Sequence, residues 1–288
     1  MRQLLTIGTV LSVLLIFFTG CTRERPRYVI GVSQCSEDIW REKQNAELRM
    51  GAYLQDDVKL RFAAAFDSDE RQVQQIDSLV ATGIDLLIVA PNQVQTISPA
   101  IDRAYDKGIP VIVFERKTNS QKYTAFISAD NYEMGRVMGE YIASQLNGRG
   151  RVVEIMGLEG SSPAIERHNG FADALKKHPG IEIVATLQGD WTEESAVKAV
   201  QNYQGDLSHI DFVFGQNDRM AMGARKTLST LHFPQNSAAS TAYLVRMVAS
   251  VWCATPYLTL LTSIPPTATR FYDSPSTFLM VSHSRRKR

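Results

Sequence analysis

Polar and aromatic side chains follow several of the apolar segments in this sequence. The stretch SQCSEDIWREKQN at 33–45, for example, follows an apolar run at 28–32. Carboxylates and Asn pair with adjacent hydroxyls, Arg donates through a planar fork, and Trp stacks on the C–H face of a ring, so this mixture suits a carbohydrate. The candidate ligand-binding residues are Glu37, Trp40, Glu115, Arg116, Asp130, Trp191, Asn217 and Asp218.

No pattern typical of catalysis accompanies these residues. None of the five histidines has a second histidine four residues away, and the sequence lacks a GxSxG elbow, a P-loop and a complete GxGxxG. GLEGSS at 157–162 could cradle a phosphate, but a strand-to-helix turn is the favoured interpretation. Cys21, Cys35 and Cys253 lack metal-ligand spacing. We therefore expect a binding protein that is not an enzyme and holds no metal or cofactor.

Each candidate also has a structural interpretation. Asp218 and Asn131 could cap helices, and Trp40 could belong to a core. Arg167, which follows another apolar segment, could bridge to an acid. Because the candidates gather after six different segments, binding is favoured over six separate structural roles.

The elements that must position these residues alternate along the chain. Continuous apolar runs such as DLLIVA and IPVIVF are typical of strands buried on both faces of a parallel sheet, and the stretches between them have helical spacing. This alternation predicts an α/β fold, in which ligands bind at the carboxyl ends of the strands. Strands are expected at 28–33, 58–63, 84–90, 110–114, 124–128, 151–156, 181–187 and 211–214.

The two ends of the chain depart from this pattern. Arg2 and an apolar run at 4–18 end in Thr19-Gly20-Cys21, which predicts an export signal at 1–25. Two alternatives stay open: a lipoprotein that carries its lipid on Cys21, and an uncleaved anchor. Both place the chain from about residue 26 onward outside the cytoplasmic membrane, tethered to it. The net charge of +1 gives no field that would attract nucleic acid.

The last 60 residues contain no Gly, no Glu and a single acid, Asp273, and the strand–helix alternation stops there. We interpret this as a change of reading frame near Ser237. The expected organisation is a first lobe at 26–130, an incomplete second lobe at 131–236 and an aberrant tail at 237–288.

Five motifs resemble one known family. They are VAPN at 89–92, GIPVIVFERK at 108–117, ISADNYEMGRVMGEYI at 127–142, ERHNGF at 166–171 and FGQNDRMAMGA at 214–224. The sequence resembles the periplasmic sugar-binding proteins of the ribose-binding type, which share their fold with the LacI repressor core. The stretch that starts at Ser33 is similar to the sensor domains of hybrid two-component carbohydrate regulators. The resemblance implies a two-lobed type I periplasmic-binding-protein fold with a monosaccharide between the lobes, in a sensor or in an ABC transporter lipoprotein.

The resemblance also implies roles for single residues. Trp40 and Trp191 match ring-stacking aromatics, Glu115 and Arg116 match an Asp-Arg pair, and Asn217 matches a hydroxyl-binding Asn. Ile165 stands where a ribose-binding Arg is usual, so ribose is disfavoured and fructose or another monosaccharide is expected. A homodimer is implied for the sensor. The last strands of both lobes are expected to be missing, which would leave sheet edges unpaired and binding weak or absent.

Overall fold

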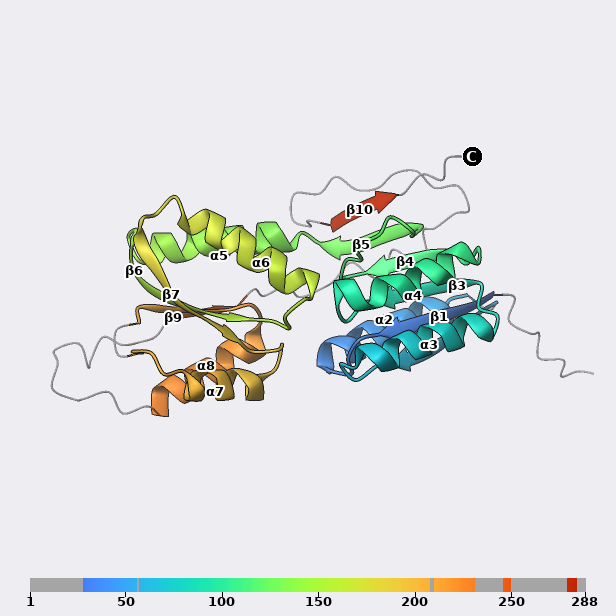
Figure 1. Cartoon of the computed structure of the whole chain (residues 1–288), viewed down its shortest axis with the longest axis horizontal. Coiled ribbons are helices and arrows are strands. Elements are labelled where there is room, and N and C mark those ends of the chain that lie inside the picture. Colours follow the sequence, from blue (N-terminus) through green and yellow to red (C-terminus); the bar gives the residue numbers. More distant parts are fainter. Residues whose placement is uncertain (1–27, 56, 208–209, 231–245, 250–278, 284–288) are drawn as a thin grey trace, which may run out of the picture.

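The computed structural model describes residues 28–55, 57–207, 210–230, 246–249 and 279–283. These residues form two lobes, each a sheet flanked by helices (Figure 1). The first lobe contains β1 (Tyr28–Gln34), α2 (Ile39–Tyr53), β2 (Val58–Ala64), α3 (Asp69–Ala81), β3 (Leu86–Ala90), α4 (Val94–Asp106), β4 (Val111–Phe114), β5 (Ala125–Ala129) and β10 (Leu279–His283). The second contains α5 (Asn131–Gln145), β6 (Arg149–Met156), α6 (Ser162–Leu175), β7 (Gly180–Gln188), α7 (Glu193–Asn202), β8 (Phe212–Gly215), α8 (Asp218–Thr230) and β9 (Arg246–Ala249).

The sheets are parallel apart from one edge strand. Their orders are β10-β5-β4-β3-β1-β2 and β7-β6-β8-β9, and only β10 runs antiparallel to its neighbour. All eight strands expected from the sequence are present. The central strands are buried on both faces: in β3, Leu87 and Val89 belong to the core under α3 and α4, whereas Ile88 packs on the side of α2. The prediction of an α/β fold with parallel sheets between helices is confirmed.

Two glycines bring α5 and α6 into close contact in the second lobe. A Cβ added at Gly135 would lie 1.9 Å from the carbonyl oxygen of Arg167, and one at Gly170 would lie 1.9 Å from that of Tyr132. Any larger residue would therefore push the helices apart. This contact fixes the position of α6, whose first turns face the first lobe.

The pairing of two short strands of the tail contradicts one expectation. We expected the edges of both sheets to be unpaired, but β9 pairs with β8 over four residues and β10 pairs with β5 over five. An open edge offers backbone N–H and C=O groups that a short segment can pair with, whatever sequence precedes it. The reading-frame hypothesis concerns residues that lie mostly outside the described ones, and it stays a prediction.

The expected export signal and Cys21 also lie outside the described residues. Among the residues that are described, no helix has both the length and the apolar character to cross a membrane.

Candidate functional site

The carboxyl ends of the strands of the two lobes face one another at the lobe junction (Figure 1). The backbone N–H of Lys117, just after β4, donates to Ser162 Oγ at the start of α6 over 2.7 Å. The N–H of Val94 donates to the carbonyl of Gly160 over 3.2 Å, and the ammonium of Lys117 is paired with Glu166. The lobes are therefore in direct contact, as in a closed two-lobed arrangement.

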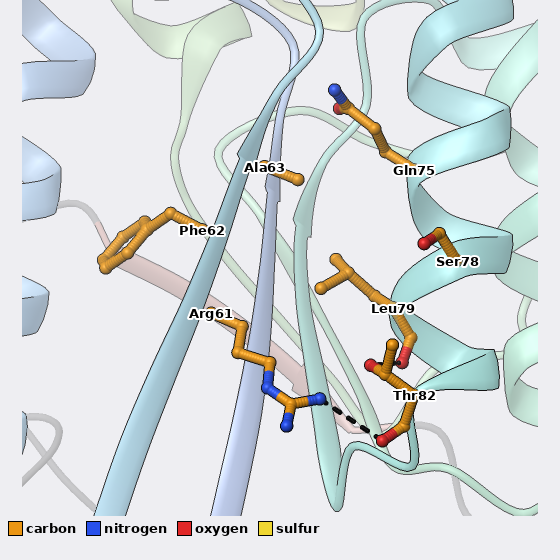
Figure 2. Close-up of a pocket in the computed structure, with 7 residues that line it drawn as sticks. All are labelled: Arg61, Phe62, Ala63, Gln75, Ser78, Leu79 and Thr82. Carbon is orange, nitrogen blue, oxygen red and sulfur yellow. Dashed lines mark hydrogen bonds between the residues drawn. The ribbon is translucent and has the colours of Figure 1, made fainter.

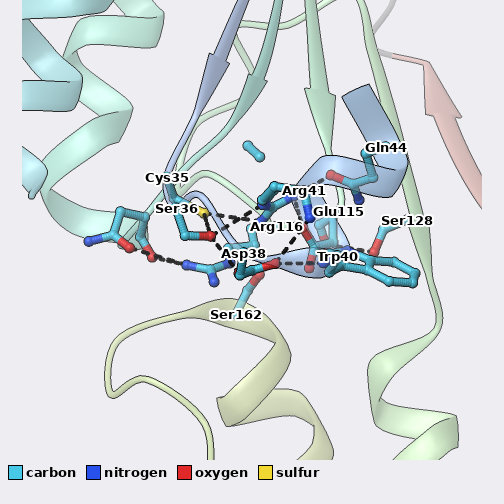
Figure 3. A network of polar contacts seen from close by, with 12 residues as sticks. Cys35, Ser36, Asp38, Trp40, Arg41, Gln44, Glu115, Arg116, Ser128 and Ser162 are labelled. Carbon is cyan, nitrogen blue, oxygen red and sulfur yellow. Dashed lines mark hydrogen bonds and ion pairs between the residues drawn. The ribbon is translucent and has the colours of Figure 1, made fainter. Parts of the chain in front are cut away.

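The turn after β1 carries Glu37, Asp38 and Trp40 and begins α2. Asp38 caps the helix, because its carboxylate accepts from the N–H groups of Trp40 at 2.8 Å and Arg41 at 3.0 Å. Trp40 is half-buried, whereas Glu37 is exposed at the start of the turn. Figure 3 shows this turn with Arg41 and the residues after β4 beside it.

Arg41 is the site residue that the sequence did not predict. Its guanidinium donates to Gln44 Oε1 over 2.7 Å and to Cys35 Sγ over 3.0 Å, and it is ion-paired with Glu115 (Figure 3). Only 1% of Arg41 is exposed. A charged residue in the first turn of a helix usually faces solvent, so only its position next to Trp40 could have suggested this role.

Hydrogen bonds to neighbouring segments hold Glu115 through its backbone and Arg116 through its side chain. Glu115 has a φ of 65°, in the left-handed region that non-glycine residues rarely adopt. Its N–H donates to Ile127, and its carbonyl accepts from Ser128 Oγ at 2.7 Å. Arg116 is buried and donates to the carbonyl of Asn92 over 2.9 Å. Strained residues of this kind concentrate at functional sites, where neighbouring contacts hold them in place.

In the second lobe, Trp191 lies at an equally unusual turn. Its φ is 67° and that of Asp190 is 48°. The indole lies against Gly157, where an added Cβ would come within 2.1 Å of the ring, and the guanidinium of Arg167 lies 5.4 Å from the ring centre. Asn217 supports the turn, because its Nδ2 donates to the Trp191 carbonyl over 3.0 Å.

Arg167 joins the second lobe to the segment that connects the lobes. Its Nε donates to Asn131 Oδ1 over 3.0 Å, and its Nη1 donates to the carbonyl of Gln216 over 2.7 Å. Its hydrogen-bond acceptors are thus an amide and a carbonyl rather than the acid considered as an alternative. Burial lowers the pKa of Arg167 to about 10, an effect that Glu115 partly offsets, so the side chain stays charged at neutral pH.

Two predicted residues also have capping roles. Asp130 accepts from the N–H of Glu133 at 2.9 Å and caps α5, and Asn217 accepts from the N–H of Met220 at 2.8 Å at the start of α8. The caps considered from the sequence, Asn131 and Asp218, are each one residue too late. Asn131 is buried against Arg167, and Asp218 is exposed in the first turn of α8.

Three predicted residues keep buried polar atoms without a hydrogen-bond partner among the described residues. They are Glu115 Oε2, Arg116 Nε and Trp191 Nε1. Glu115 Oε2 is close to Arg41, but the contact lacks hydrogen-bond geometry, so we count it as an ion pair only. An unsatisfied buried polar atom costs about 1–3 kcal/mol, so Arg116 Nε and Trp191 Nε1, one from each lobe, favour a polar partner at the junction, whereas Arg41 already neutralises Glu115.

A hollow of the first lobe lies away from the residues of the junction. It has a volume of 480 Å³ and lies between β2 and α3, where Arg61 donates to the carbonyl of Thr82 over 3.2 Å (Figure 2). None of the predicted ligand-binding residues lines it. The candidate site is therefore the lobe junction and not this hollow.

Two α/β lobes with their strand ends facing each other are the architecture in which ligands lie outside the carboxyl ends of the strands. The chain belongs to the periplasmic binding protein family, because the profile of the periplasmic binding protein domain matches residues 30–240. The galactofuranose-binding protein YtfQ of Escherichia coli K12 is 30% identical over 203 residues, which cover 68% of this chain and 64% of YtfQ. The E. coli ribose import binding protein RbsB is 29% identical over 56% of this chain and 54% of its own length. The chain thus spans less than two thirds of these relatives.

Solved structures of sugar-binding proteins superpose on this chain. The fructose-binding periplasmic domain of the hybrid two-component system BT1754 superposes with a TM-score of 0.69 and 41% identity, covering 70% of this chain and 67% of that domain. The crystal structure of a galactofuranose-binding protein has a TM-score of 0.66 and 28% identity, covering 70% of this chain and 71% of the other. Membership of a family of this kind agrees with the resemblance inferred from the sequence.

Proposed function

We propose that this chain binds a monosaccharide between its two lobes, outside the cytoplasmic membrane, as the sensor domain of a hybrid two-component system. The observation that carries the proposal is the pair of buried atoms without a hydrogen-bond partner on Arg116 and Trp191, together with the ion-paired carboxylate of Glu115. Glu115 and Arg116 belong to one lobe and Trp191 to the other, so a ligand that contacts all three holds the lobes together.

The chemistry of these groups fits a sugar. Glu115 can accept from a hydroxyl, Arg116 Nε can donate to one, and the indole N–H of Trp191 can donate to a third. Trp40 and Trp191 supply aromatic faces from the two lobes. Glu37, Asp130, Asn217 and Asp218 follow strands at the same junction and are proposed as outer contacts, although Asp130 and Asn217 keep one oxygen in a helix cap.

Fructose is the first sugar to test, because BT1754 is a fructose-binding domain and shares 41% identity with this chain. Ribose is disfavoured, because Ile165 offers no hydrogen bond where ribose-binding relatives are expected to have Arg. Isothermal titration of the full chain with fructose, galactose, arabinose and ribose tests this. The proposal requires binding of at least one of these sugars and at least a tenfold loss in Trp191→Ala. Binding of none of them by a folded chain would contradict it.

The alternative is a sugar-binding lipoprotein of an ABC transporter, since YtfQ and RbsB are transport-type relatives. The sensor is favoured by the higher identity to BT1754. The two readings differ at the proposed tether. In the lipoprotein, labelled palmitate is incorporated into the chain and Cys21→Ser abolishes the label, whereas a protein with an uncleaved anchor takes up no label at Cys21. Metabolic labelling of cells that express the full chain separates the two outcomes.

A further inference from the structure

The outer face of α2 carries a row of exposed side chains at the spacing of paired helices. Ile39, Lys43, Ala46, Met50 and Tyr53 follow one another at steps of four, three, four and three residues. All five are exposed, and the exposed fractions are 72% for Ile39, 50% for Met50 and 82% for Tyr53. Alternating steps of four and three keep one side of a helix turned toward a partner helix.

This row is distinct from the core side of α2. Arg41 and Gln44 are buried on the opposite side of the helix, and Leu48 packs against the sheet with Phe62. Four of the eleven large apolar side chains that are exposed among the described residues belong to α2 or to the residue that follows it. The fourth is Leu54, which widens the row at its C-terminal end. Such a concentration marks an interaction surface, whereas single exposed apolar residues do not.

The charges beside the row favour a second copy of the same helix in antiparallel orientation. Glu42 and Arg49 lie on one flank and are both exposed, and the guanidinium of Arg49 is held 4.5 Å from the ring centre of Phe62. Glu47 lies on the other flank, 3.2 Å from Lys43. In a parallel pair opposite flanks meet, which brings Glu42 toward Glu47 of the second copy. In an antiparallel pair, the same flank of each helix meets its counterpart. Glu42 of each copy then lies next to Arg49 of the other, which gives two ion pairs.

The two ends of the row are equidistant from Ala46. Ile39 and Tyr53 lie seven residues on either side of Ala46, so a twofold axis at Ala46 packs Ile39 of each copy against Tyr53 of the other. The small side chain of Ala46 lets the helices approach at the axis. A helix of 15 residues is only about 22 Å long, so the contact is smaller than a standard interface and the association is weak.

We propose that α2 is a self-association surface through which two copies of this chain pair antiparallel, with Ile39, Ala46, Met50 and Tyr53 in the contact and Glu42–Arg49 ion pairs beside it. The pairing does not depend on the proposed sugar binding. It begins at the same turn as the candidate site, because Ile39 directly precedes Trp40 and Arg41. A conformational change at that turn would therefore displace Ile39 and alter the pairing of the two copies.

Cysteine cross-linking of the full chain tests the geometry, with copper–phenanthroline and oxygen as the oxidant. Ala46→Cys should form a disulfide between copies at least five times faster than Ala81→Cys, an exposed alanine of α3 that serves as the matched control. The unmodified chain sets the background of its native thiols. A mixture of Ile39→Cys and Tyr53→Cys chains should cross-link more than Ile39→Cys alone. Equal rates for Ala46→Cys and Ala81→Cys, or faster linking of Ile39→Cys alone, overturn the proposal.

Sedimentation equilibrium tests the energetics without cross-links. The dissociation constant of the dimer should rise at least tenfold in Met50→Glu and stay unchanged in Met222→Glu, which alters an equally exposed methionine of α8. Arg49→Glu should weaken the dimer, and Glu42→Arg added to it should restore the dimer. Thermal unfolding confirms that each variant folds. A chain that stays monomeric up to millimolar concentration, or one whose Met50→Glu variant loses only binding to phospholipid vesicles, overturns the proposal.

Discussion

Arg41 and Glu115 form an ion pair at the lobe junction although they are 74 positions apart in the sequence and belong to different elements of the first lobe. The side chain of Arg41 is 1% exposed and that of Glu115 is 21% exposed. Arg41 thereby ties the first turn of α2 to the strained residue after β4. The pair fixes the two segments that carry most of the proposed contacts of the first lobe.

Arg41→Met should destabilise the chain, because it leaves a half-buried carboxylate without its cation. Removing one partner of a buried pair costs about 3–5 kcal/mol, and the partial exposure of Glu115 places the expected loss at the lower end. Urea unfolding of the full chain, followed by far-ultraviolet circular dichroism, measures this loss. The double variant Arg41→Met with Glu115→Gln should recover part of it, and no recovery would show that Arg41 acts only through Cys35 and Gln44.

Gly157→Ala should displace the indole of Trp191. An added Cβ would lie 2.1 Å from the ring, closer than any Cβ contact allows, so the indole must move away from Gly157. If Trp191 stacks on the sugar, affinity falls by roughly tenfold, which corresponds to the loss of an aromatic contact. Titration calorimetry checks this, with Trp191→Phe as the matched control that keeps a smaller ring. Unchanged affinity in Gly157→Ala would show that Trp191 does not contact the sugar.

The sequence predicted those features that depend on local pattern. Strands such as β3 were found because burial on both faces produces a continuous apolar run. Glu115 and Trp191 were predicted as contacts because each follows an expected strand, and their role in binding stays a prediction. Arg41 was missed because its burial depends on Glu115, a contact that no local pattern records. The pairing of β9 and β10 was missed because an edge strand is recruited through its backbone, so side-chain periodicity does not predict it.

Ser162→Ala should weaken closure of the lobes. Ser162 Oγ accepts the N–H of Lys117 across the junction, and loss of that acceptor leaves a half-buried donor unpaired at a cost of about 1–3 kcal/mol. The contact joins the two lobes, so we expect its loss to shift the equilibrium toward open lobes. Small-angle scattering should show a larger radius of gyration for the unliganded variant than for the parent chain. Ser144→Ala, which changes an exposed serine in the last turn of α5, should leave the radius unchanged.

Stability should fall as the pH rises through neutrality because of His168. Its Nδ1 lies 2.7 Å from Oε2 of Glu154, which is fully buried in β6 and also accepts from Gln216 Nε2 at 2.9 Å. The hydrogen bond to Glu154 raises the pKa of His168, and burial opposes this only in part. A raised folded-state pKa means that the stabilisation is complete below about 6.5, the value for an unfolded histidine, and is lost as the pH rises through the folded-state pKa. The free energy of unfolding, measured with urea between pH 6 and 8, should therefore decline with pH, and it should decline less steeply in His168→Gln than in the unchanged chain. Glu154→Gln should flatten it as well, and an unchanged slope in both variants would assign the decline to other groups.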